Sequence, residues 1–177
     1  MLIVEGPDGA GKTTLALRLS EDLQWPVATR VVGADTQIVG GRTELKSWVE
    51  ENLAQGFQQT IFDRHRLISE PIYGPLFRGE LQDGFDDDLW FAGAWNLLLA
   101  IRPVVVFCLP PLDQVMRNLR DDEENVVVRD KAPIVYWQYW TLYCRMGVRA
   151  MRYDYTNFRN TYSAILAWAQ TEEENHR

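Results

Sequence analysis

The chain has 177 residues, of which 46% are apolar and 24% are charged. This length fits one domain with a substantial buried core, and the composition excludes a collagen-like, disordered or disulfide-rich chain. With 25 acidic and 18 basic residues the net charge is −7, which argues against nonspecific binding of nucleic acid because such binding needs clustered cations. A local basic cleft for a small polyanion is compatible with this charge.

Short apolar runs alternate with segments of helical period, a pattern that predicts an α/β fold with a parallel sheet covered on both faces. Strands are predicted at 2–4, 27–32, 60–62, 104–109 and 150–153. Helices are predicted at 13–24, 44–53, 87–101, 112–119, 134–148 and 159–170, with a loop after residue 63 and a solvated tail at 171–177. We therefore expect a single domain over 1–177 with a five-stranded sheet.

The sequence predicts neither a membrane span nor a signal peptide. The apolar stretch 89–109 is divided by Arg102-Pro103, so a buried helix followed by a buried strand fits it better than a span. No basic region precedes the apolar run at the start of the chain. Cys108 and Cys144 lack metal-ligand spacing and are typical of core thiols in a reducing compartment. We expect a cytoplasmic protein.

Residues 6–13 read GPDGAGKT and satisfy the pattern G-x-x-x-x-G-K-[ST] between a predicted strand and a predicted helix. Glycines let backbone amides converge on phosphate oxygens at a helix N-terminus. Lys12 would reach the β- and γ-phosphates of a nucleotide, and the Thr13 hydroxyl would bind magnesium. The cofactors are therefore expected to be ATP and Mg²⁺, with the nucleotide held by Gly6, Asp8, Gly9, Ala10, Gly11, Lys12, Thr13 and Thr14.

A second acidic site follows the strand predicted at 60–62. Asp63 ends this strand, where parallel α/β folds place their ligands. Its carboxylate could hold magnesium or act on an acceptor oxygen, and Arg64 beside it could neutralise an acceptor phosphate. The alternative is a strand-end ion pair, which contributes little at a surface. With the phosphate loop upstream, we favour the functional interpretation.

These motifs resemble those of the thymidylate kinase branch of the P-loop nucleoside and nucleotide kinases. The start, EGPDGAGKTT, is similar to the opening of that family, and DRHRLISEPIYGPLFRG resembles its DR motif and the residues that follow. In this chain the serine, tyrosine and arginine-glycine of that pattern all lie one residue further from Asp63-Arg64. The stretches LPPLDQVMRNLRDDEE and RYDYTNFRNTYSAILAW resemble the family's lid helix and its last strand and helix. Deoxynucleoside kinases share the plan, with a glutamate-arginine pair at the DR position.

The resemblance implies a P-loop NTPase fold and an acceptor pocket. It places Asp8 near the acceptor sugar and Arg64 near the acceptor phosphate. It places Arg78 at the pyrimidine edge, with Ser69 and Tyr73 lining the same pocket. These roles are expectations from the resemblance.

The resemblance also implies a short lid that carries arginines, at 117–133. Some thymidylate kinases have a catalytic arginine inside the phosphate loop, where this chain has Gly9, so the chain resembles the class in which the lid supplies it. A guanidinium can follow the charge that spreads over a moving phosphoryl group. The candidates are Arg117, Arg120 and Arg129, and the alternative for the first two is a solvated ion pair with Asp121 or Glu124.

Aromatic residues on the helix predicted at 87–101 are candidates for stacking on an acceptor base. Trp90, Phe91 and Trp95 would border the acceptor pocket, and flat rings suit aromatic faces. Most other aromatic residues are expected in the core or on a dimer surface. His65 follows the DR pair, so we expect it either to line the pocket or to be hydrogen-bonded in a structural role.

The sequence thus predicts a magnesium-dependent kinase that transfers the γ-phosphate of ATP to a deoxynucleoside monophosphate, dTMP first. The alternatives are a kinase of a modified pyrimidine such as 5-hydroxymethyluracil, as a nucleotide or within DNA, a deoxynucleoside kinase, and an NTP-driven switch without an acceptor. The acidic charge weakens the DNA version, and the DR motif and the arginine-rich lid disfavour the switch. The expected partner is a small nucleotide rather than nucleic acid or a membrane, and the resemblance allows a homodimer.

Overall fold

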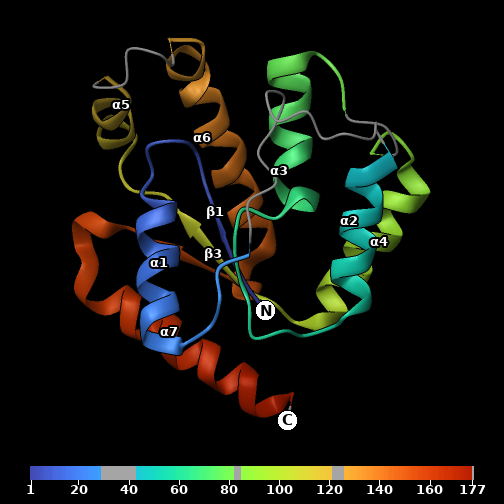
Figure 1. The fold of residues 1–177 in the computed structure, drawn as a ribbon. Coiled ribbons are helices and arrows are strands. Elements are labelled where there is room, and N and C mark those ends of the chain that lie inside the picture. The colour runs from blue at the N-terminus through green and yellow to red at the C-terminus, as the bar shows by residue number, and fades with distance from the viewer. Residues whose placement is uncertain (29–42, 82–84, 121–125, 177) are drawn as a thin grey trace.

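A parallel sheet of four strands forms the centre of the computed structural model, which describes residues 1–28, 43–81, 85–120 and 126–176. The strands lie in the order β2-β1-β3-β4 (Figure 1). They are β1 (Leu2–Glu5), β2 (Ile61–Asp63), β3 (Val104–Cys108) and β4 (Ala150–Tyr153). Every residue of β1, β2 and β3 is buried, as expected of parallel strands covered on both faces.

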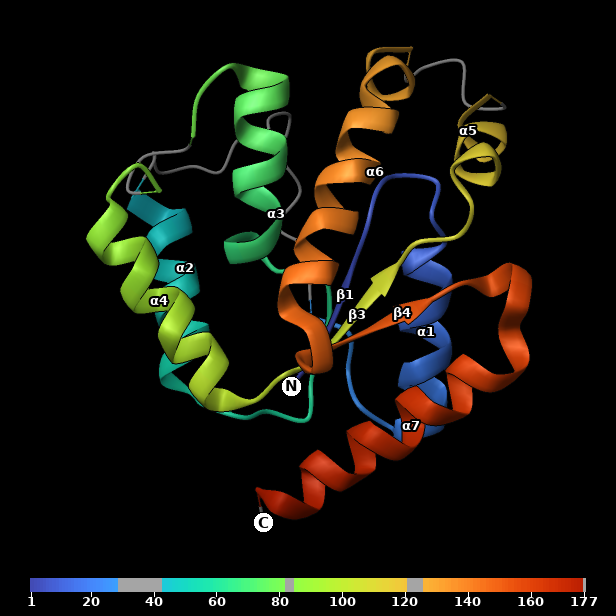
Figure 2. The same ribbon diagram turned by 180° about the vertical axis from the view of Figure 1, so that it is seen from behind.

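Helices cover both faces of this sheet. On one face α1 and α7 pack together, and on the other lie α3 and α6, with α2 and α4 beside α3 (Figures 1 and 2). The helices are α1 (Lys12–Leu23), α2 (Thr43–Ala54), α3 (Arg66–Tyr73), α4 (Asp88–Ile101), α5 (Leu112–Arg120), α6 (Val126–Met146) and α7 (Phe158–Asn175). A π-helical turn, η1 (Gly74–Arg78), continues α3, and the short 3₁₀ turns η3 (Gly147–Arg149) and η4 (Tyr155–Asn157) flank β4.

The strand order determines where a ligand can bind. From β1 the chain passes to β2 on one side and later to β3 on the other, so the order reverses at β1. Ligands of such sheets bind outside the carboxyl ends of the strands at this point of reversal. The register pairs Val4 with Asp63, which brings the end of β2 beside the loop that leaves β1.

The predicted α/β architecture is confirmed, with four described strands instead of five. Of the strand predicted at 27–32, Val27 forms a single parallel bridge to Ile61, and residues 29–32 lie outside the described residues. The stretch 89–109 divides into α4 and β3, as expected. Among the described residues, no helix is both long enough and apolar enough to cross a bilayer.

Three predicted boundaries are wrong, each because tertiary packing prevails over local sequence signals. The segment after Asp63 is helical instead of a loop, since α3 buries its apolar face. Helix α6 begins at Val126 instead of residue 134, although it contains Pro133, and the turn before this proline contacts η1 through a hydrogen bond from Lys131 to the carbonyl oxygen of Leu76. Helix α7 continues to Asn175, where the expected tail packs through a hydrogen bond between Gln59 and Glu173 (2.6 Å).

Gly6 occupies a position where no other residue fits. Its φ is +142°, and a Cβ atom there would lie 2.5 Å from the carbonyl oxygen of Cys108, a contact that no side-chain rotation can relieve. We therefore expect Gly6→Ala to lower the free energy of unfolding by about 3 kcal/mol or more. Gly56 is the control, because its φ is also positive (+69°) but a Cβ would meet no atom within 4 Å.

For the control Gly56→Ala we expect a loss of only about 1 kcal/mol, the cost of the left-handed conformation alone. Urea unfolding of both variants measures the difference. Equal losses would contradict the close approach of the phosphate loop to β3.

Candidate active site

The loop after β1 leads directly into the N-terminus of α1, which no side chain caps within the described residues. Gly11 is the N-cap in a left-handed conformation, and the first turn of α1 carries no acidic residue. Helix N-termini have backbone amides without intrahelical partners, and these attract anions. The loop and the helix N-terminus therefore have the backbone geometry that the predicted phosphate site requires.

Lys12 lies folded into this loop and is almost completely buried. Its Nζ donates a hydrogen bond to the carbonyl oxygen of Pro7 (2.7 Å) and lies 3.9 Å from the carboxylate of Asp8. Burial, and next the positive charge of Arg64, lower the pKa of Lys12 to about 8. An anion bound beside Lys12 would therefore stabilise its protonated form.

Thr13 and Asp63 meet at the point where α1 and β2 come together. The Thr13 hydroxyl donates a hydrogen bond to Oδ2 of Asp63 (2.7 Å), while Oδ1 of Asp63 is buried and has no partner among the described residues. Carboxylate and hydroxyl oxygens are the hard donors that magnesium prefers, with phosphates and water completing its shell. The two side chains fit the predicted metal site, and the described residues contain no cluster of three acidic, histidine or cysteine side chains that could hold a metal.

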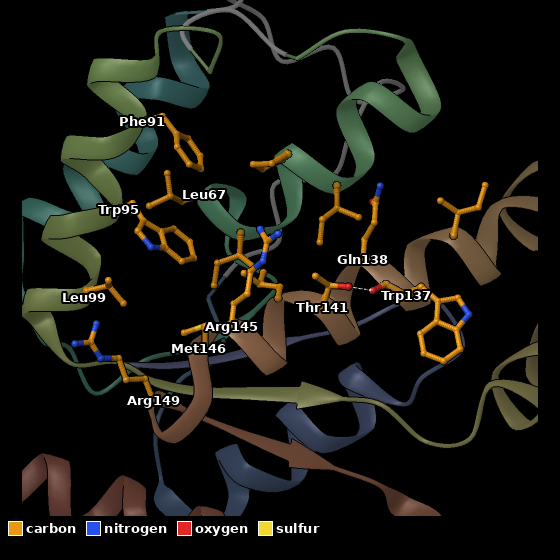
Figure 3. A pocket seen from close by; sticks show the side chains of 15 residues that line it. Leu67, Phe91, Trp95, Leu99, Trp137, Gln138, Thr141, Arg145, Met146 and Arg149 are labelled. Carbon is orange, nitrogen blue, oxygen red and sulfur yellow. Dashed lines mark hydrogen bonds between the residues drawn. The ribbon is translucent and has the colours of Figure 1, made fainter.

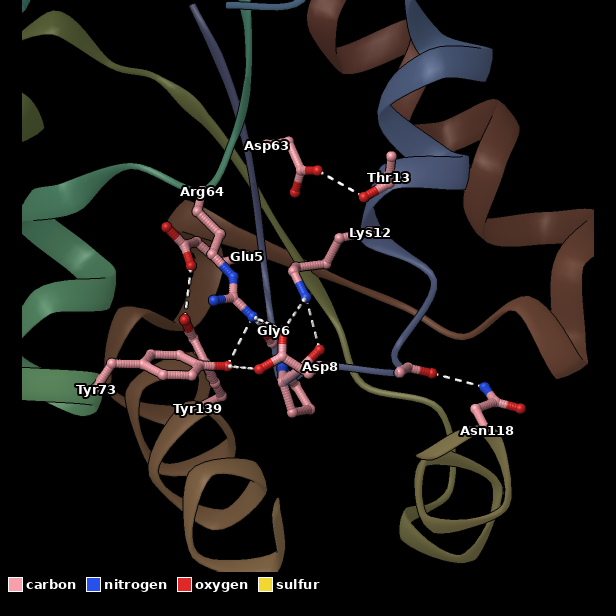
Figure 4. Close-up of polar contacts among 12 residues, drawn as sticks. Glu5, Gly6, Asp8, Lys12, Thr13, Asp63, Arg64, Tyr73, Asn118 and Tyr139 are labelled. Carbon is pink, nitrogen blue, oxygen red and sulfur yellow. Dashed lines mark hydrogen bonds and ion pairs between the residues drawn. The ribbon is translucent and has the colours of Figure 1, made fainter. Parts of the chain in front are cut away.

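Arg64 reaches across from the end of β2 to the phosphate loop (Figure 4). Its Nη2 donates to Oδ1 of Asp8 (2.5 Å) and to the Tyr73 hydroxyl (2.7 Å), and the hydroxyl donates to Oδ2 of Asp8 (3.2 Å). Its φ of +72° is uncommon for a residue other than glycine. Such strain persists where surrounding contacts require it, and here those contacts join the loop, β2 and α3.

Asp8, Arg64 and Tyr73 form a triad, and the charges around it keep Arg64 protonated. Burial opposes its charge, but Tyr73, Tyr139 and Asp8 outweigh burial and raise the pKa of Arg64 above its ordinary value. The guanidinium also lies 4.4 Å from the centre of the Tyr73 ring, a cation–π contact. Asp8 therefore lies between two cations, Lys12 on the loop side and Arg64 on the β2 side.

A buried carboxylate near the triad, that of Glu5, has no predicted role from the sequence. Glu5, the last residue of β1, accepts hydrogen bonds from the backbone amide of His65 (2.7 Å) and the hydroxyl of Tyr139 (2.9 Å). Burial raises the pKa of Glu5 to about 7. These bonds connect β1, the start of α3 and α6. The only signal in the sequence is an acidic residue that ends an otherwise apolar run.

Helix α5 lies against the phosphate loop at Gly9. The side-chain amide of Asn118 donates to the Gly9 carbonyl oxygen (2.6 Å) and to the Tyr155 hydroxyl (2.7 Å). Gly9 has a φ of +74°, and a Cβ there would lie 3.1 Å from Cγ of Leu119. Position 9 is thus crowded as well as strained for a side chain. Asn118 and Tyr155 border the loop without having been predicted to do so.

The three lid arginines occupy different surroundings. Arg117 is exposed and forms an ion pair with Asp113 (2.6 Å), while Asp121 and Glu124, its alternative partners, lie outside the described residues. Arg120 is exposed at the end of α5, and Arg129 is half-buried in α6. The described structure shows no acidic partner for either, and residues 121–125 separate the two helices.

Two of the predicted acceptor residues make contacts within the unit formed by α3 and η1. The Ser69 hydroxyl donates to the His65 carbonyl oxygen (3.3 Å), and Arg78 forms an ion pair with Glu70. Of the predicted pocket residues outside the phosphate loop, only Tyr73 and Arg64 are brought together with Asp8.

The three predicted stacking residues all lie on α4, and their contacts differ. The Trp90 indole donates to Glu50 of α2 (2.8 Å). Phe91 and Trp95 stack on each other (6.2 Å between ring centres) and line a groove between α3, α4 and α6 (Figure 3). The residues that line this groove include neither the phosphate loop nor Arg64.

The His65 ring is fully buried beside Trp48 and Phe62, at ring-centre distances of 5.3 Å and 5.5 Å. Neither ring nitrogen has a partner among the described residues, whereas the backbone amide of His65 donates to Glu5. Burial lowers the pKa of His65 to about 4.

This depressed pKa predicts a pH-dependent stability. Below pH 6.5 the unfolded chain takes up a proton at His65 that the folded chain refuses down to pH 4, so stability falls by up to about 3 kcal/mol. In His65→Phe this loss is absent. As pH falls from 7.5 to 4.5, we expect the unfolding free energy of the wild type to decrease relative to that of the variant. A difference in unfolding free energy that is independent of pH would contradict the burial of a neutral imidazole. The titration of Glu5 occurs in both proteins, so its contribution cancels in this difference.

Comparisons with known proteins establish the fold. No protein-family model matches the chain, and no curated protein shows significant sequence similarity to it. Among solved structures, the YorR protein from Bacillus subtilis in complex with phosphorylated GDP superposes with a TM-score of 0.73 at 18% identity, over 99% of this chain and 98% of that chain.

Two kinases are also similar, at lower scores. Deoxyadenosine kinase from M. mycoides, with the products dCMP and dCDP, has a TM-score of 0.56 at 12% identity, over 99% of each chain. Shikimate kinase from Acinetobacter baumannii has a TM-score of 0.54 at 18% identity, over 98% of this chain and 93% of that chain. The chain thus has the α/β fold of P-loop kinases over its whole length, and these comparisons do not single out the thymidylate kinase branch.

Proposed function

We propose that the chain is an ATP- and Mg²⁺-dependent kinase that transfers the γ-phosphate to a deoxynucleoside monophosphate, with dTMP as the first candidate. One observation carries the proposal. The carboxylate of Asp8 lies 2.5 Å from Nη2 of Arg64 and 3.9 Å from Nζ of Lys12. Transfer between two phosphates needs two cationic sites side by side, one for the donor and one for the acceptor, and these two cations meet that need.

The donor side consists of the phosphate loop and the metal residues. The uncapped amides of α1 and Lys12 would hold the β- and γ-phosphates. Thr13 and Asp63 would hold magnesium, which when bound would neutralise charge on the donor phosphates. Residues 6–14 thus bind and orient the ATP phosphates.

The acceptor side is the triad of Asp8, Arg64 and Tyr73. An acceptor phosphate would take the place of the Asp8 carboxylate at Arg64, because guanidinium binds phosphate with a similar geometry. Asp8 and the Tyr73 hydroxyl would then be available to the acceptor sugar. Recognition of a pyrimidine by Ser69, Arg78, Trp90, Phe91 or Trp95 belongs to the same proposal and rests on the resemblance of their motifs.

The lid would complete the site with a guanidinium. Position 9 of the loop has no room for an arginine side chain, since Leu119 and the backbone of α5 lie against it. The arginine therefore has to come from elsewhere, and Arg117, Arg120 and Arg129 flank the connection between α5 and α6.

A deoxynucleoside kinase is the second candidate, and one contact favours it. Asp8 already neutralises Arg64, and a carboxylate held in this way can accept the proton of an acceptor hydroxyl. The similarity to deoxyadenosine kinase is compatible with this alternative.

ADP release in the presence of ATP and Mg²⁺ separates the candidates. The acceptors to compare are dTMP, dUMP, dCMP, hydroxymethylated dUMP, the corresponding nucleosides and shikimate. We expect stimulation by a pyrimidine monophosphate above all. Stimulation by nucleosides alone would establish the second candidate, and turnover without any acceptor dependence would contradict both.

Replacing Arg64 tests the acceptor site. We expect Arg64→Ala to raise the KM for the monophosphate about 10- to 100-fold, the value of a charge-assisted hydrogen bond, with little change in the KM for ATP. The control Tyr73→Phe keeps the guanidinium and removes only one oxygen, so its effect should be smaller. An unchanged acceptor KM in Arg64→Ala would refute the role of Arg64.

The low pKa of Lys12 predicts how ATP affinity depends on pH. Phosphates bind the protonated form, so affinity should be constant below pH 7 and fall as pH rises through about 8. Calorimetric titration with ATP and Mg²⁺ from pH 6.5 to 9 measures this, and proton uptake on binding should be small below pH 7, rise through pH 8 and be larger at pH 9. Lys12→Ala should lose both turnover and this dependence while remaining folded. A pH-independent affinity in the wild type would contradict the assignment.

A further inference from the structure

The groove between α3, α4 and α6 lies outside the candidate active site and is large enough to hold a small molecule (Figure 3). Its volume is about 940 Å³. Ligand pockets ordinarily have volumes of roughly 300–1,000 Å³ and are lined by apolar side chains with a few polar groups that orient the ligand. Neither the phosphate loop nor Arg64 lines the groove, so the proposed kinase reaction does not account for it.

Three helices contribute apolar side chains to the groove. Phe91, Trp95 and Leu99 lie four residues apart on α4 and therefore share one face of that helix. From α3 the groove is lined by Leu67, Ile68, Pro71 and Ile72. On α6 the lining includes Ile134 and Trp137, which are 50% and 55% exposed. Large apolar side chains that remain half in water around a concave surface are typical of a binding site.

The polar groups of the groove are few, and all belong to α6 or to the turn after it. They are Gln138, Thr141, Arg145 and Arg149, and no acidic residue is among the described residues of the lining. The Thr141 hydroxyl already donates a hydrogen bond to the carbonyl oxygen of Trp137 (2.9 Å). For the two arginines the described structure shows no acidic partner. The groove therefore offers two guanidinium groups to an anion.

These arginines lie at one end of a long apolar lining. Along α6 the lining extends from Ile134 to Arg145, which is about 16 Å of helix. Figure 3 shows Arg149 beside Leu99 at one end of the groove and Trp137 at the other, with Arg145 between α4 and α6. The groove is thus apolar over most of its length and cationic at one end.

We propose that this groove binds an amphipathic anion, namely an alkyl carboxylate of the kind found in medium- and long-chain fatty acids. The hydrocarbon chain would lie between α3, α4 and α6, and the carboxylate would lie at Arg145 and Arg149. Guanidinium groups bind carboxylates through paired hydrogen bonds. A hydrocarbon chain brings no polar atom to the apolar walls, so it is buried there without loss of hydrogen bonds.

A nucleotide suits this groove less well than an alkyl chain does. The polar edges of a base lose their hydrogen bonds with water on burial, and protein groups have to replace them. The walls formed by α3 and α4 consist of aliphatic and aromatic side chains, and apart from the arginines only Gln138 and Thr141 could supply such groups. The positive charge of the groove likewise disfavours a cationic ligand.

The groove shares helix α3 with the candidate active site. Ile68 and Ile72 line the groove, while the last residue of the same helix, Tyr73, accepts a hydrogen bond from Arg64 (2.7 Å). A ligand in the groove would therefore contact the helix that carries part of the acceptor triad. Binding itself uses no residue of the phosphate loop or the triad, so it is tested without turnover and independently of the proposed kinase reaction.

Calorimetric titration of the wild type with octanoate, decanoate and dodecanoate, below the concentrations at which they form micelles, tests the proposal. We expect the affinity to rise about fourfold with each added methylene, because each one leaves water for an apolar wall. Decyltrimethylammonium has a similar chain and the opposite charge, and we expect it to bind about tenfold more weakly than decanoate or worse. An affinity independent of chain length, or a cation that binds as well as decanoate, would overturn the proposal.

Matched variants locate the bound carboxylate and the chain. We expect Arg145→Gln with Arg149→Gln to weaken decanoate binding about tenfold, whereas Arg18→Gln, at an exposed arginine of α1, should leave it unchanged. Ile134→Asp should also weaken binding about tenfold, since it places a like charge and an unpaired polar group against the chain. Its control is Leu17→Asp on α1, where the leucine is 56% exposed. Circular dichroism and the urea midpoint show that each variant is folded.

Three results would contradict a fatty acid site in this groove. The first is a Kd for decanoate above about 1 mM in the wild type. The second is decanoate binding that the variants at Ile134, Arg145 and Arg149 leave unchanged, which would place the ligand elsewhere. The third is a groove closed by a second copy of the chain, which sedimentation equilibrium would show as a dimer that decanoate neither binds nor dissociates and that Ile134→Asp converts to a monomer.

Discussion

A buried carboxylate holds together the three segments on which the candidate site depends. Glu5 ends β1 and accepts hydrogen bonds from the amide of His65 and the hydroxyl of Tyr139. It thereby joins the phosphate loop, the residues after β2 and helix α6. Leaving such an acceptor unsatisfied in the interior costs about 1–3 kcal/mol per group, so the arrangement is strongly favoured. Arg64 immediately precedes His65, and its position beside the loop follows from this anchor.

The site built on that anchor concentrates its charges locally in an acidic protein. Lys12 is buried and Arg64 is largely buried, and Asp8 lies between them as the anion that both contact. In water such pairs contribute little, but where water is partly excluded they are stronger and more directional. The net charge of −7 is therefore compatible with a local group of cations beyond the ends of β1 and β2.

Local patterns in the sequence predict the parts of this structure that depend on local chemistry. The phosphate loop, the strand ending in Asp63 and helix α4 with Asp87 as its N-cap all follow from residue type and spacing. Contacts between distant residues do not: Tyr139 reaches Glu5 across 134 positions, and the sequence gives no sign of that pairing. Pro133 likewise indicates a helix start, but α6 begins at Val126, and Lys131 in its added turns donates a hydrogen bond to the carbonyl oxygen of Leu76 in η1.

The central claim is that donor and acceptor phosphates meet between Lys12 and Arg64. A crystal structure with a bisubstrate analogue, in which adenosine and thymidine are joined by a chain of phosphates, tests this most directly. The account predicts phosphates that run from the amides of α1 past Lys12 to Arg64, with the carboxylate of Asp8 displaced from the guanidinium. Phosphates confined to the loop, with the pair of Asp8 and Arg64 intact, would contradict it.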